Sequence, residues 1–462
     1  MRYSLRDMSA ARKFSSALTV DVLHHAIPPE AITAVLDAAD AHEQRERKLS
    51  QTAVVWLLIA MNLFSSLALD AVLAKLVKGL RYVWPDPTIL LPSASAITYR
   101  RYQLGARPLV ALYKRVCRPI ATAQTRGAFR FGYRLMAVDG TIEEVPDTPA
   151  NAAYWGRQAL ARGTTAYPQV QAVYLLEAGT HAIVDAGFWP YAISERVGGK
   201  RLLRSVDAGM LVMWDRGFHS FDMLLAARQR GAQVLSRLPA TVHPEVIEHL
   251  ADGSLLAYLY PSEYQRRRQG ERMLVRVIRY TVSDPRLVGY QEEHRLITSL
   301  LDVVAAPALE LAASYHERWE SENVIDELDT HQRIAGRVLR SESPVGVVQE
   351  LYGLLLAHYA VRVLMHEAAC QAEVDPDRVS FVRALELIRD AIPEFQITAL
   401  AQVPQLLSRL LTDMTCKLLL ERQPRLNPRV VKRKISKFKL KRPEHRPCPP
   451  LNRPFDQALV LI

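Results

Sequence analysis

The chain has 462 residues, 49% hydrophobic and 23% charged, which is the composition of an ordinary globular protein long enough for two or three domains. Its four cysteines are far apart and form no CxxC pair, which excludes a disulfide framework and a thiolate zinc site. The N-terminus carries Asp7 and no apolar stretch of a secretory signal, so we expect a cytoplasmic protein.

Residues 1–120 predict a separate helical domain, because apolar positions recur at helical spacing and breakers are few. The longest apolar run, Ala53 to Leu69, is interrupted by Asn62, Ser65 and Ser66. It falls short of a membrane span. We therefore expect a buried helix and no membrane partner.

From about residue 131 the pattern changes to short β-rich runs, the first of which is "FGYRLMAVDG". Asp139 is expected at the end of this strand. The dipeptide Asp139-Gly140 between two β-like runs also suits a hairpin turn, which is the structural alternative for this aspartate.

The segment "GMLVMWDRGFHSFDML" (residues 209–224) joins five apolar residues to an aspartate. It predicts a strand buried on both faces, followed by a helix from Ser220 to about Gln229. Asp215 would lie at the carboxyl edge of the sheet, where ligands and catalytic groups of open α/β sheets collect. The alternative is an aspartate that only ends the strand or caps the helix.

Between about 240 and 300 further β-like runs follow with no helix between them, and they predict an inserted antiparallel sheet. Helices then resume. In "SYHERWESENVIDELD", at about 100° per residue, one face of a regular helix carries mostly polar side chains: Tyr315, Arg318, Trp319, Glu322, Asp326 and Asp329. A core-facing stripe would be apolar, so this face is expected to meet solvent or a polar site.

The net charge is +11, and most of it lies near the C-terminus. Between Arg422 and Arg446, eleven Lys or Arg stand against one acid, Glu444, which makes +10. Such a segment can neutralise DNA phosphates and release their counterions. The residues expected to bind DNA are Lys432, Arg433, Lys434, Lys437, Lys439, Lys441 and Arg442. The alternative is a solvated terminus with no dedicated partner.

Three carboxylates, Asp139, Asp215 and Glu322, come from two strand ends and a helix. Acidic groups brought together repel one another unless a divalent cation holds them, and such oxygen ligands suit Mg²⁺ or Mn²⁺. Two ions bridged by a shared aspartate would serve in-line phosphoryl transfer. Arg318, one turn before Glu322, could then hold a phosphate.

At these motifs the chain resembles the DDE transposases of the insertion sequence 4 family. The matching pieces are "VDGTIEEVPDTPAN", "WDRGF" and "YHERWESE", the last fitting the family's Tyr-x-x-Arg-x-x-x-Glu signature at Tyr315, Arg318 and Glu322. The resemblance implies an α/β fold, a ribonuclease H-like catalytic core with an inserted β-rich subdomain, preceded by an all-helical N-terminal domain.

The resemblance also implies a function and an organisation. Residues 1–120 would bind DNA, 121–400 would be the catalytic domain with its insertion at about 240–300, and 401–462 would be a C-terminal helix and basic tail. A homodimer would bind double-stranded DNA, as transposon terminal repeats and as target, and catalyse metal-dependent strand cleavage and strand transfer. Asp139, Asp215 and Glu322 would be both catalytic and metal-binding, with Tyr315 and Arg318 on DNA.

Two features depart from the family. Asp329 stands where the signature usually has a lysine, which predicts weaker binding of the DNA end or a decaying copy. Residues 240–300 contain no tryptophan to hold a flipped base, although tyrosines there could stack.

Two alternative interpretations of the sequence differ from this one. The sequence "AVDGT" is similar to the DxDGT signature of haloacid dehalogenase-like phosphatases, but Ala137 replaces the required nucleophile. A DNA-binding protein that descends from a transposase and has lost catalysis is the non-enzymatic alternative.

Overall fold

A computed structural model describes residues 3–8, 17–43, 45, 48–84, 90–161, 163–287, 289–420 and 454–462. The chain forms two compact units, each built from separate segments. The first contains Met1–Ala128, Gly140–Gly198 and Ser321–Leu419; the second contains Phe129–Asp139, Gly199–Glu320 and Leu420–Ile462. These units do not follow linear boundaries at 120 and 400, because strand β2 and the helical stretch near residue 320 each run from one unit into the other.

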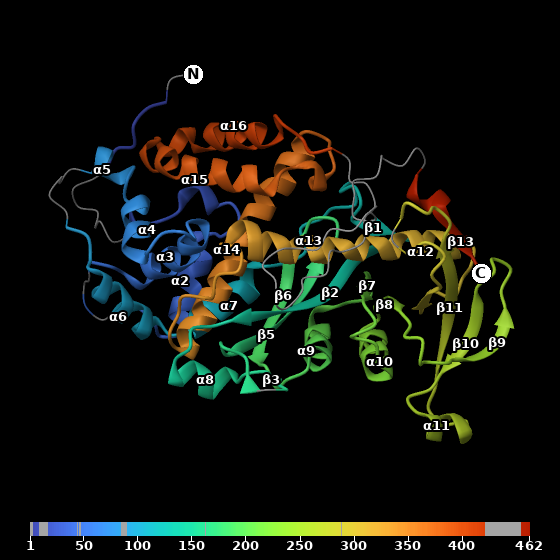
Figure 1. The fold of residues 1–462 in the computed structure, drawn as a ribbon. Helices are drawn as coiled ribbons and strands as arrows, with labels where there is room; N and C mark the ends of the chain where they lie inside the picture. Colours follow the sequence, from blue (N-terminus) through green and yellow to red (C-terminus); the bar gives the residue numbers. More distant parts are fainter. Residues whose placement is uncertain are drawn as a thin grey trace. The chain divides into compact units, whose positions relative to one another are not determined.

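The N-terminal part of the first unit is helical, as predicted (Figure 1). Its helices are α2 (Pro29–Ala38), α3 (Gln51–Leu63), α4 (Leu69–Leu76), α5 (Leu80–Val83), α6 (Ala94–Leu104) and α7 (Arg107–Val116). The Ser50 hydroxyl caps α3 by accepting a hydrogen bond from the Ala53 amide at 3.2 Å. All but one residue of α3 are buried, so the predicted buried helix is confirmed.

The C-terminal part of the first unit surrounds one long helix, α14 (Pro344–Gln371). This helix is long and apolar enough to cross a membrane, but 89% of its apolar window is buried inside the protein. It contacts α3, α7, α15 (Phe381–Ile397) and α16 (Val403–Thr415). This burial is typical of the core helix of a globular unit.

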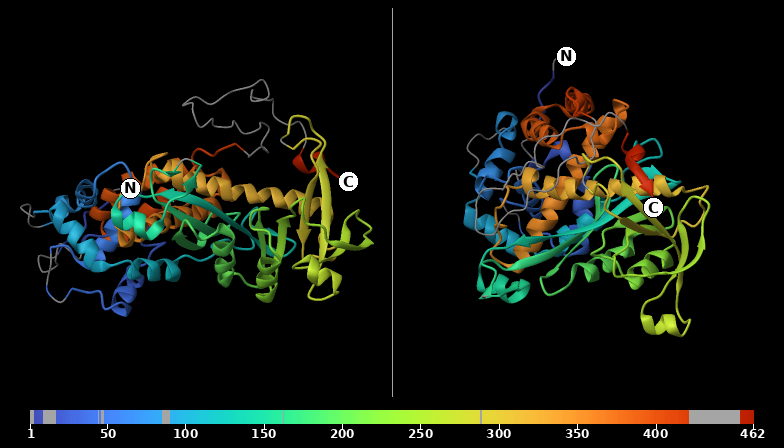
Figure 2. Two further views of the ribbon diagram at one scale, coloured as in Figure 1. Left: turned by 60° about the horizontal axis from the view of Figure 1, so that its bottom comes forward. Right: turned by 45° about the vertical axis from the view of Figure 1, so that its right-hand side comes forward.

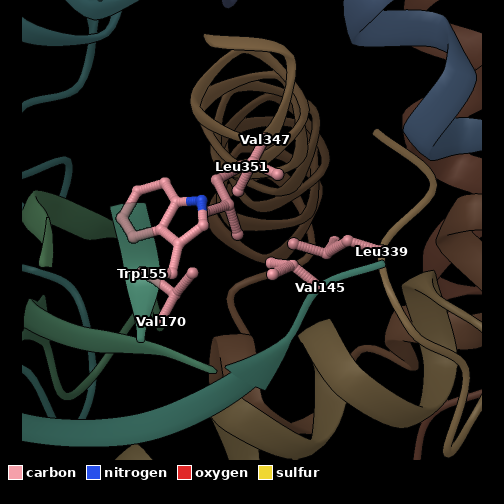
Figure 3. Packing of buried hydrophobic residues seen from close by; sticks show 6 residues of the cluster. All are labelled: Val145, Trp155, Val170, Leu339, Val347 and Leu351. Atoms are coloured by element: carbon pink, nitrogen blue, oxygen red, sulfur yellow. The ribbon is translucent and has the colours of Figure 1, made fainter. Parts of the chain in front are cut away.

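Strands β5 (Gln169–Glu177) and β6 (Ile183–Pro190) form an antiparallel pair in the first unit. Next to them, α8 (Pro149–Trp155) and the start of α14 enclose an apolar cluster (Figure 3). The cluster consists of Val145, Trp155, Val170, Leu339, Val347 and Leu351. A two-stranded hairpin, β3 (Ala159–Leu160) with β4 (Gly163–Thr164), lies apart from this sheet.

The second unit is organised on three parallel strands, β2 (Tyr133–Glu144), β7 (Met210–Trp214) and β8 (Gln233–Arg237). Strand β7 lies in the middle and all five of its residues are buried, as its apolar sequence predicts. Helix α10 (Phe221–Gln229) packs against β8, and α12 (Ala308–His316) contacts the same strand (Figure 2). Helix α9 (Glu195–Leu202) precedes β7.

The predicted β insertion forms the antiparallel order β8-β12-β11-β10-β9. Its strands are β9 (Glu245–His249), β10 (Leu255–Leu259), β11 (Met273–Val282) and β12 (His294–Thr298). One expectation needs correction, because a short helix, α11 (Glu263–Arg267), lies between β10 and β11. The inserted strands continue the sheet of the second unit, since β12 pairs directly with β8.

Short elements complete the chain. The strand β1 (Phe129–Arg130) pairs with β2, and β13 (Leu459–Leu461) pairs with β11. Brief helical turns are η1 (Asp21–Leu23), η2 (Leu203–Ser205), η5 (Pro376–Arg378), η6 (Leu400–Gln402) and η8 (Phe455–Ala458).

The helical segment after the insertion is not the single regular helix that the sequence predicts. It passes from α12 through a 3₁₀ turn, η3 (Glu317–Trp319), into α13 (Glu320–Asp326) and then into a π-helical turn, η4 (Glu327–Gln332). Because the angle per residue differs among these three forms, the face assignment at 100° per residue fails beyond Asp326.

Candidate active site

Asp139 and Asp215 occupy equivalent positions on adjacent parallel strands. The ladder between β2 and β7 ends with the pair Val138 and Trp214, and each aspartate is the next residue. Neighbouring strands are about 4.8 Å apart, so the two backbones present their carboxylates side by side. Both residues are half-buried.

One expectation about Asp139 is wrong. Strand β2 continues through Asp139 and Gly140 to Glu144, so this aspartate does not end the strand, and the dipeptide does not form a hairpin turn. What ends at Val138 is the pairing with β7. An aspartate followed by glycine suits both arrangements locally, and sequence alone does not distinguish them.

The turn after β7 fixes the Asp215 carboxylate. Its Oδ1 accepts a hydrogen bond from the Gly217 amide at 2.8 Å, and its carbonyl accepts one from the Phe218 amide at 3.3 Å. A Cβ at residue 217 would lie 3.0 Å from Asp215 Oδ1, tighter than an ordinary contact. Ser220 then caps α10 by accepting from the Met223 amide at 3.1 Å, as predicted. The motif "WDRGF" is therefore a strand end, a tight turn and a helix start.

The helical segment places Arg318 beside Asp139 and places Tyr315 beside the end of β7. Arg318 Nη1 lies 3.4 Å from Asp139 Oδ2, and both side chains are largely buried, with 12% and 16% exposed. The Tyr315 hydroxyl donates to the Trp214 carbonyl at 3.3 Å. Burial raises the pKa of Tyr315 to about 12, so the phenol remains a donor at neutral pH. DNA contact by Tyr315 would require its hydroxyl to leave this carbonyl.

Glu322 lies in α13 of the first unit, four residues after Arg318, and is half-buried. The other predicted residues of this site, Asp139, Asp215, Tyr315 and Arg318, belong to the second unit. The contacts described above join Arg318 to Asp139, and Tyr315 to Trp214, the residue before Asp215.

Asp329, the departure from the family signature, lies in a buried charged cluster of the first unit. Arg333 Nη1 lies 3.3 Å from Asp329 Oδ1 and also pairs with Glu143. Burial and the neighbouring Glu143 raise the pKa of Asp329 to about 8. The raised pKa favours the protonated form of this side chain near neutral pH, and weaker binding of the DNA end stays a prediction. The π-helical turn carries Asp329 to this cluster.

A second buried cluster, which the sequence did not predict, surrounds Glu327. Its carboxylate is bound by Arg362, by His358 Nε2 at 3.0 Å and by His181 Nδ1 at 3.1 Å. Burial alone would raise the pKa of Glu327, but these partners hold it well below its usual range. The partners come from α14 and from the turn before β6, and no local pattern marks such distant pairings.

The basic tail residues from Lys432 to Arg442 lie outside the described residues. The chain after them is described again from Pro454, and β13 pairs with β11 through Leu459 and Leu461.

Comparison with known proteins identifies the class to which these motifs belong. Residues 17–114 match the family model of the insertion element 4 transposase N-terminal region, and residues 130–360 match the transposase DDE domain. The chain belongs to the insertion sequence 4 family of DDE transposases, and it is a transposase that cleaves and transfers DNA.

Individual relatives agree with this assignment. The chain is 27% identical to transposase InsG of insertion sequence element IS4 from Escherichia coli (strain K12), over 89% of this chain and 92% of that protein. It is 32% identical to the putative transposase InsZ of the same organism, over 34% of this chain and 54% of InsZ. Among solved structures, the piggyBac transposase synaptic complex with hairpin DNA aligns with a TM-score of 0.40 and 9% identity, over 89% of this chain and 88% of that one.

Proposed function

We propose that Asp139, Asp215 and Glu322 together hold the divalent ions that a DDE domain requires, Mg²⁺ or Mn²⁺, as a pair. The observation that carries this proposal is the register of β2 and β7, which makes Asp139 and Asp215 adjacent at one strand edge. Glu322 would complete the set, four residues after Arg318, whose Nη1 lies 3.4 Å from Asp139 Oδ2. All three are oxygen donors, which suits these ions.

The chemistry of these side chains alone suits a bound cation. Two carboxylates on neighbouring strands repel each other, and the nearby Arg318 at 3.4 Å supplies one positive charge to Asp139. When bound, a pair of divalent ions would activate water or a 3′-hydroxyl and stabilise the leaving oxygen of the DNA strand.

The side chains around the carboxylates have distinct proposed roles. Tyr315 and the Gly217 amide hold the strand end and the Asp215 carboxylate in place. Arg318, which lies beside Asp139, would bind a DNA phosphate with its planar guanidinium.

We further propose that the enzyme acts as a homodimer on duplex DNA, with the transposon terminal repeats and the target as its two DNA partners, in the bacterial cytoplasm at the nucleoid. The parallel strands β2, β7 and β8, with helices packed on them, support a ribonuclease H-like core. The basic tail, Lys432 to Arg442, would add sequence-independent phosphate contacts.

The experiment is a cleavage assay with purified protein and labelled duplexes that carry the ends of the element encoding it. We expect strand cleavage at the ends with Mg²⁺ or Mn²⁺ and none after chelation with EDTA. Cleavage that continues undiminished in EDTA would contradict the metal-dependent mechanism.

A further inference from the structure

Helix α6 has an unusual distribution of side chains for a helix at the surface. Its two arginines point inward: Arg100 is buried, and its Nε donates to the Leu49 carbonyl at 3.0 Å. Arg101 Nη2 donates to Ser341 Oγ at 3.1 Å. The aromatic residues point outward instead, with Tyr99 62% and Tyr102 81% exposed. An ordinary amphipathic helix would place these residues the other way round.

The outward face of α6 is uncharged and rich in hydrogen-bonding groups. At about 100° per residue its exposed side chains span an arc of roughly 140°. They are Ser95, Thr98, Tyr99, Tyr102 and Gln103. The opposite face, with Ile97, Arg100 and Leu104, packs on α3 and α4 (Figure 1). Hydroxyl and amide groups of this kind can read base edges in the major groove, which admits one α-helix.

The segment around α6 is strongly basic. Residues 71–118 contain nine Lys or Arg against one acid, Asp86, a net charge of +8. Seven of these cations are exposed: Lys75, Lys78, Arg81, Arg107, Lys114, Arg115 and Arg118. They come from α4, the turn after it, α5, α7 and the chain directly after α7, before and after α6 in the sequence. An uncharged helix face within a basic segment is the pattern expected for base contacts flanked by phosphate contacts.

The helix is also held rigidly. Gln349 Nε2, on α14, donates to the carbonyls of Arg101 and Gly105, both at 2.8 Å. The Ser93 hydroxyl caps the N-terminus by accepting from the Ala96 amide at 3.3 Å. Side chains on a fixed element can be presented to a partner with little loss of entropy on binding.

We propose that α6 is the helix with which this transposase reads its terminal repeat, with its exposed face in the major groove and the surrounding cations on the phosphates. The proposal rests on the proposed function, because it assigns the DNA partner to a surface. A second copy of the chain is the competing occupant. Charge favours DNA, since two copies meeting here would bring two +8 segments together.

The test compares binding to a duplex that carries the terminal repeat with binding to the same duplex after the repeat is scrambled, without divalent metal. Tyr99→Ala with Tyr102→Ala should lower affinity for the repeat about ten-fold or more and leave affinity for the scrambled duplex nearly unchanged. The matched control is Tyr154→Ala with Tyr167→Ala, whose tyrosines are 55% and 39% exposed and lie outside α6 and outside the β insertion. The control should bind both duplexes like the unmodified protein.

A charge variant separates the two kinds of contact. Replacing Lys75, Lys78 and Arg81 by Gln should weaken binding to both duplexes alike and flatten the dependence of log affinity on log salt by about 0.9 per lost phosphate contact. Melting curves and sedimentation of every variant report folding and assembly.

Two results would overturn the proposal. One is a tyrosine variant that discriminates the repeat as well as the control does. The other is loss of dimer with unchanged DNA binding, which would assign α6 to a second copy. Metal-dependent cleavage is measured separately, so a protein that binds its repeat selectively without cutting would refute the catalytic proposal and leave this one standing.

Discussion

The negative charges of the carboxylates at the strand edge and of those inside the first unit are compensated in different ways. Inside, Glu327 is bound by Arg362, His181 and His358, and Asp329 gains a proton beside Arg333 and Glu143. At the edge, Asp139 and Asp215 follow a paired position of two adjacent parallel strands, and Arg318 lies 3.4 Å from Asp139. A carboxylate whose charge is cancelled by the fold stabilises structure, whereas two carboxylates on adjacent strands can bind a cation.

The largest effect on stability is expected at Glu327. Glu327→Gln removes the anion that compensates the buried Arg362, and we expect a loss of about 3–5 kcal/mol in the free energy of unfolding. Urea unfolding measures it. The matched control is Asp326→Asn, one residue earlier and exposed, which should change stability by less than about 0.5 kcal/mol. Equal unfolding midpoints for the two variants would contradict the stabilising role of the Glu327 carboxylate.

A smaller, pH-dependent effect is expected at Asp329. Its pKa in the folded state is about 8, above the ordinary value of about 3.9, so the folded protein binds a proton that the unfolded chain has released. Stability should therefore fall as pH rises from about 4 to 8. Asp329→Asn stays neutral and should escape this loss, being more stable than the unmodified protein by about 1 kcal/mol above pH 8.

Thermal or urea unfolding between pH 5 and 9 measures this difference. The expected difference in the free energy of unfolding is small because 34% of the Asp329 side chain is exposed to solvent. Asp326→Asn should keep most of the fall, because Asp326 is the weakest of the named causes that raise the pKa of Asp329. If the Asp329→Asn curve runs parallel to that of the unmodified protein, the carboxyl is ionised throughout and the neutral cluster is refuted.

The smallest effect is expected at Tyr315, next to the strand edge. Tyr315→Phe removes the hydrogen bond to the Trp214 carbonyl and should cost about 1 kcal/mol of stability. If the hydroxyl only positions the strand end, affinity for DNA should remain unchanged, which a binding titration checks. A fall in DNA affinity at unchanged stability would instead favour the predicted DNA contact of Tyr315.

Several strands and helices could be predicted from the sequence because local sequence patterns determine them. Five apolar residues before Asp215 specify a central strand, and Ser220 marks the next helix. The fully apolar stretch after Ser50 specifies a buried helix. In these cases strand burial, capping and helix periodicity act over a few residues, and the structure follows them.

The rest depends on partners distant in the chain. The surroundings of Asp329 could not be predicted from the sequence, because they depend on Glu143 in another segment and on a π-helical turn. The continuation of β2 past Asp139 is likewise a matter of strand pairing, which the Asp-Gly dipeptide does not encode. The basic segment around α6 is visible in the sequence as a run with a single acid, but which of its side chains are exposed depends on how α6 packs against α3 and α4.

The most direct test of the central claim is Mn²⁺ binding, measured by electron paramagnetic resonance, together with strand cleavage by the same preparations of the unmodified protein, Asp139→Asn and Asp215→Asn. Each variant should lose Mn²⁺ binding and cut at least about 1,000-fold more slowly, with its affinity for DNA in the absence of metal retained. A variant that binds Mn²⁺ and cuts the DNA ends as the unmodified protein does would contradict the assignment of that aspartate to the metal site.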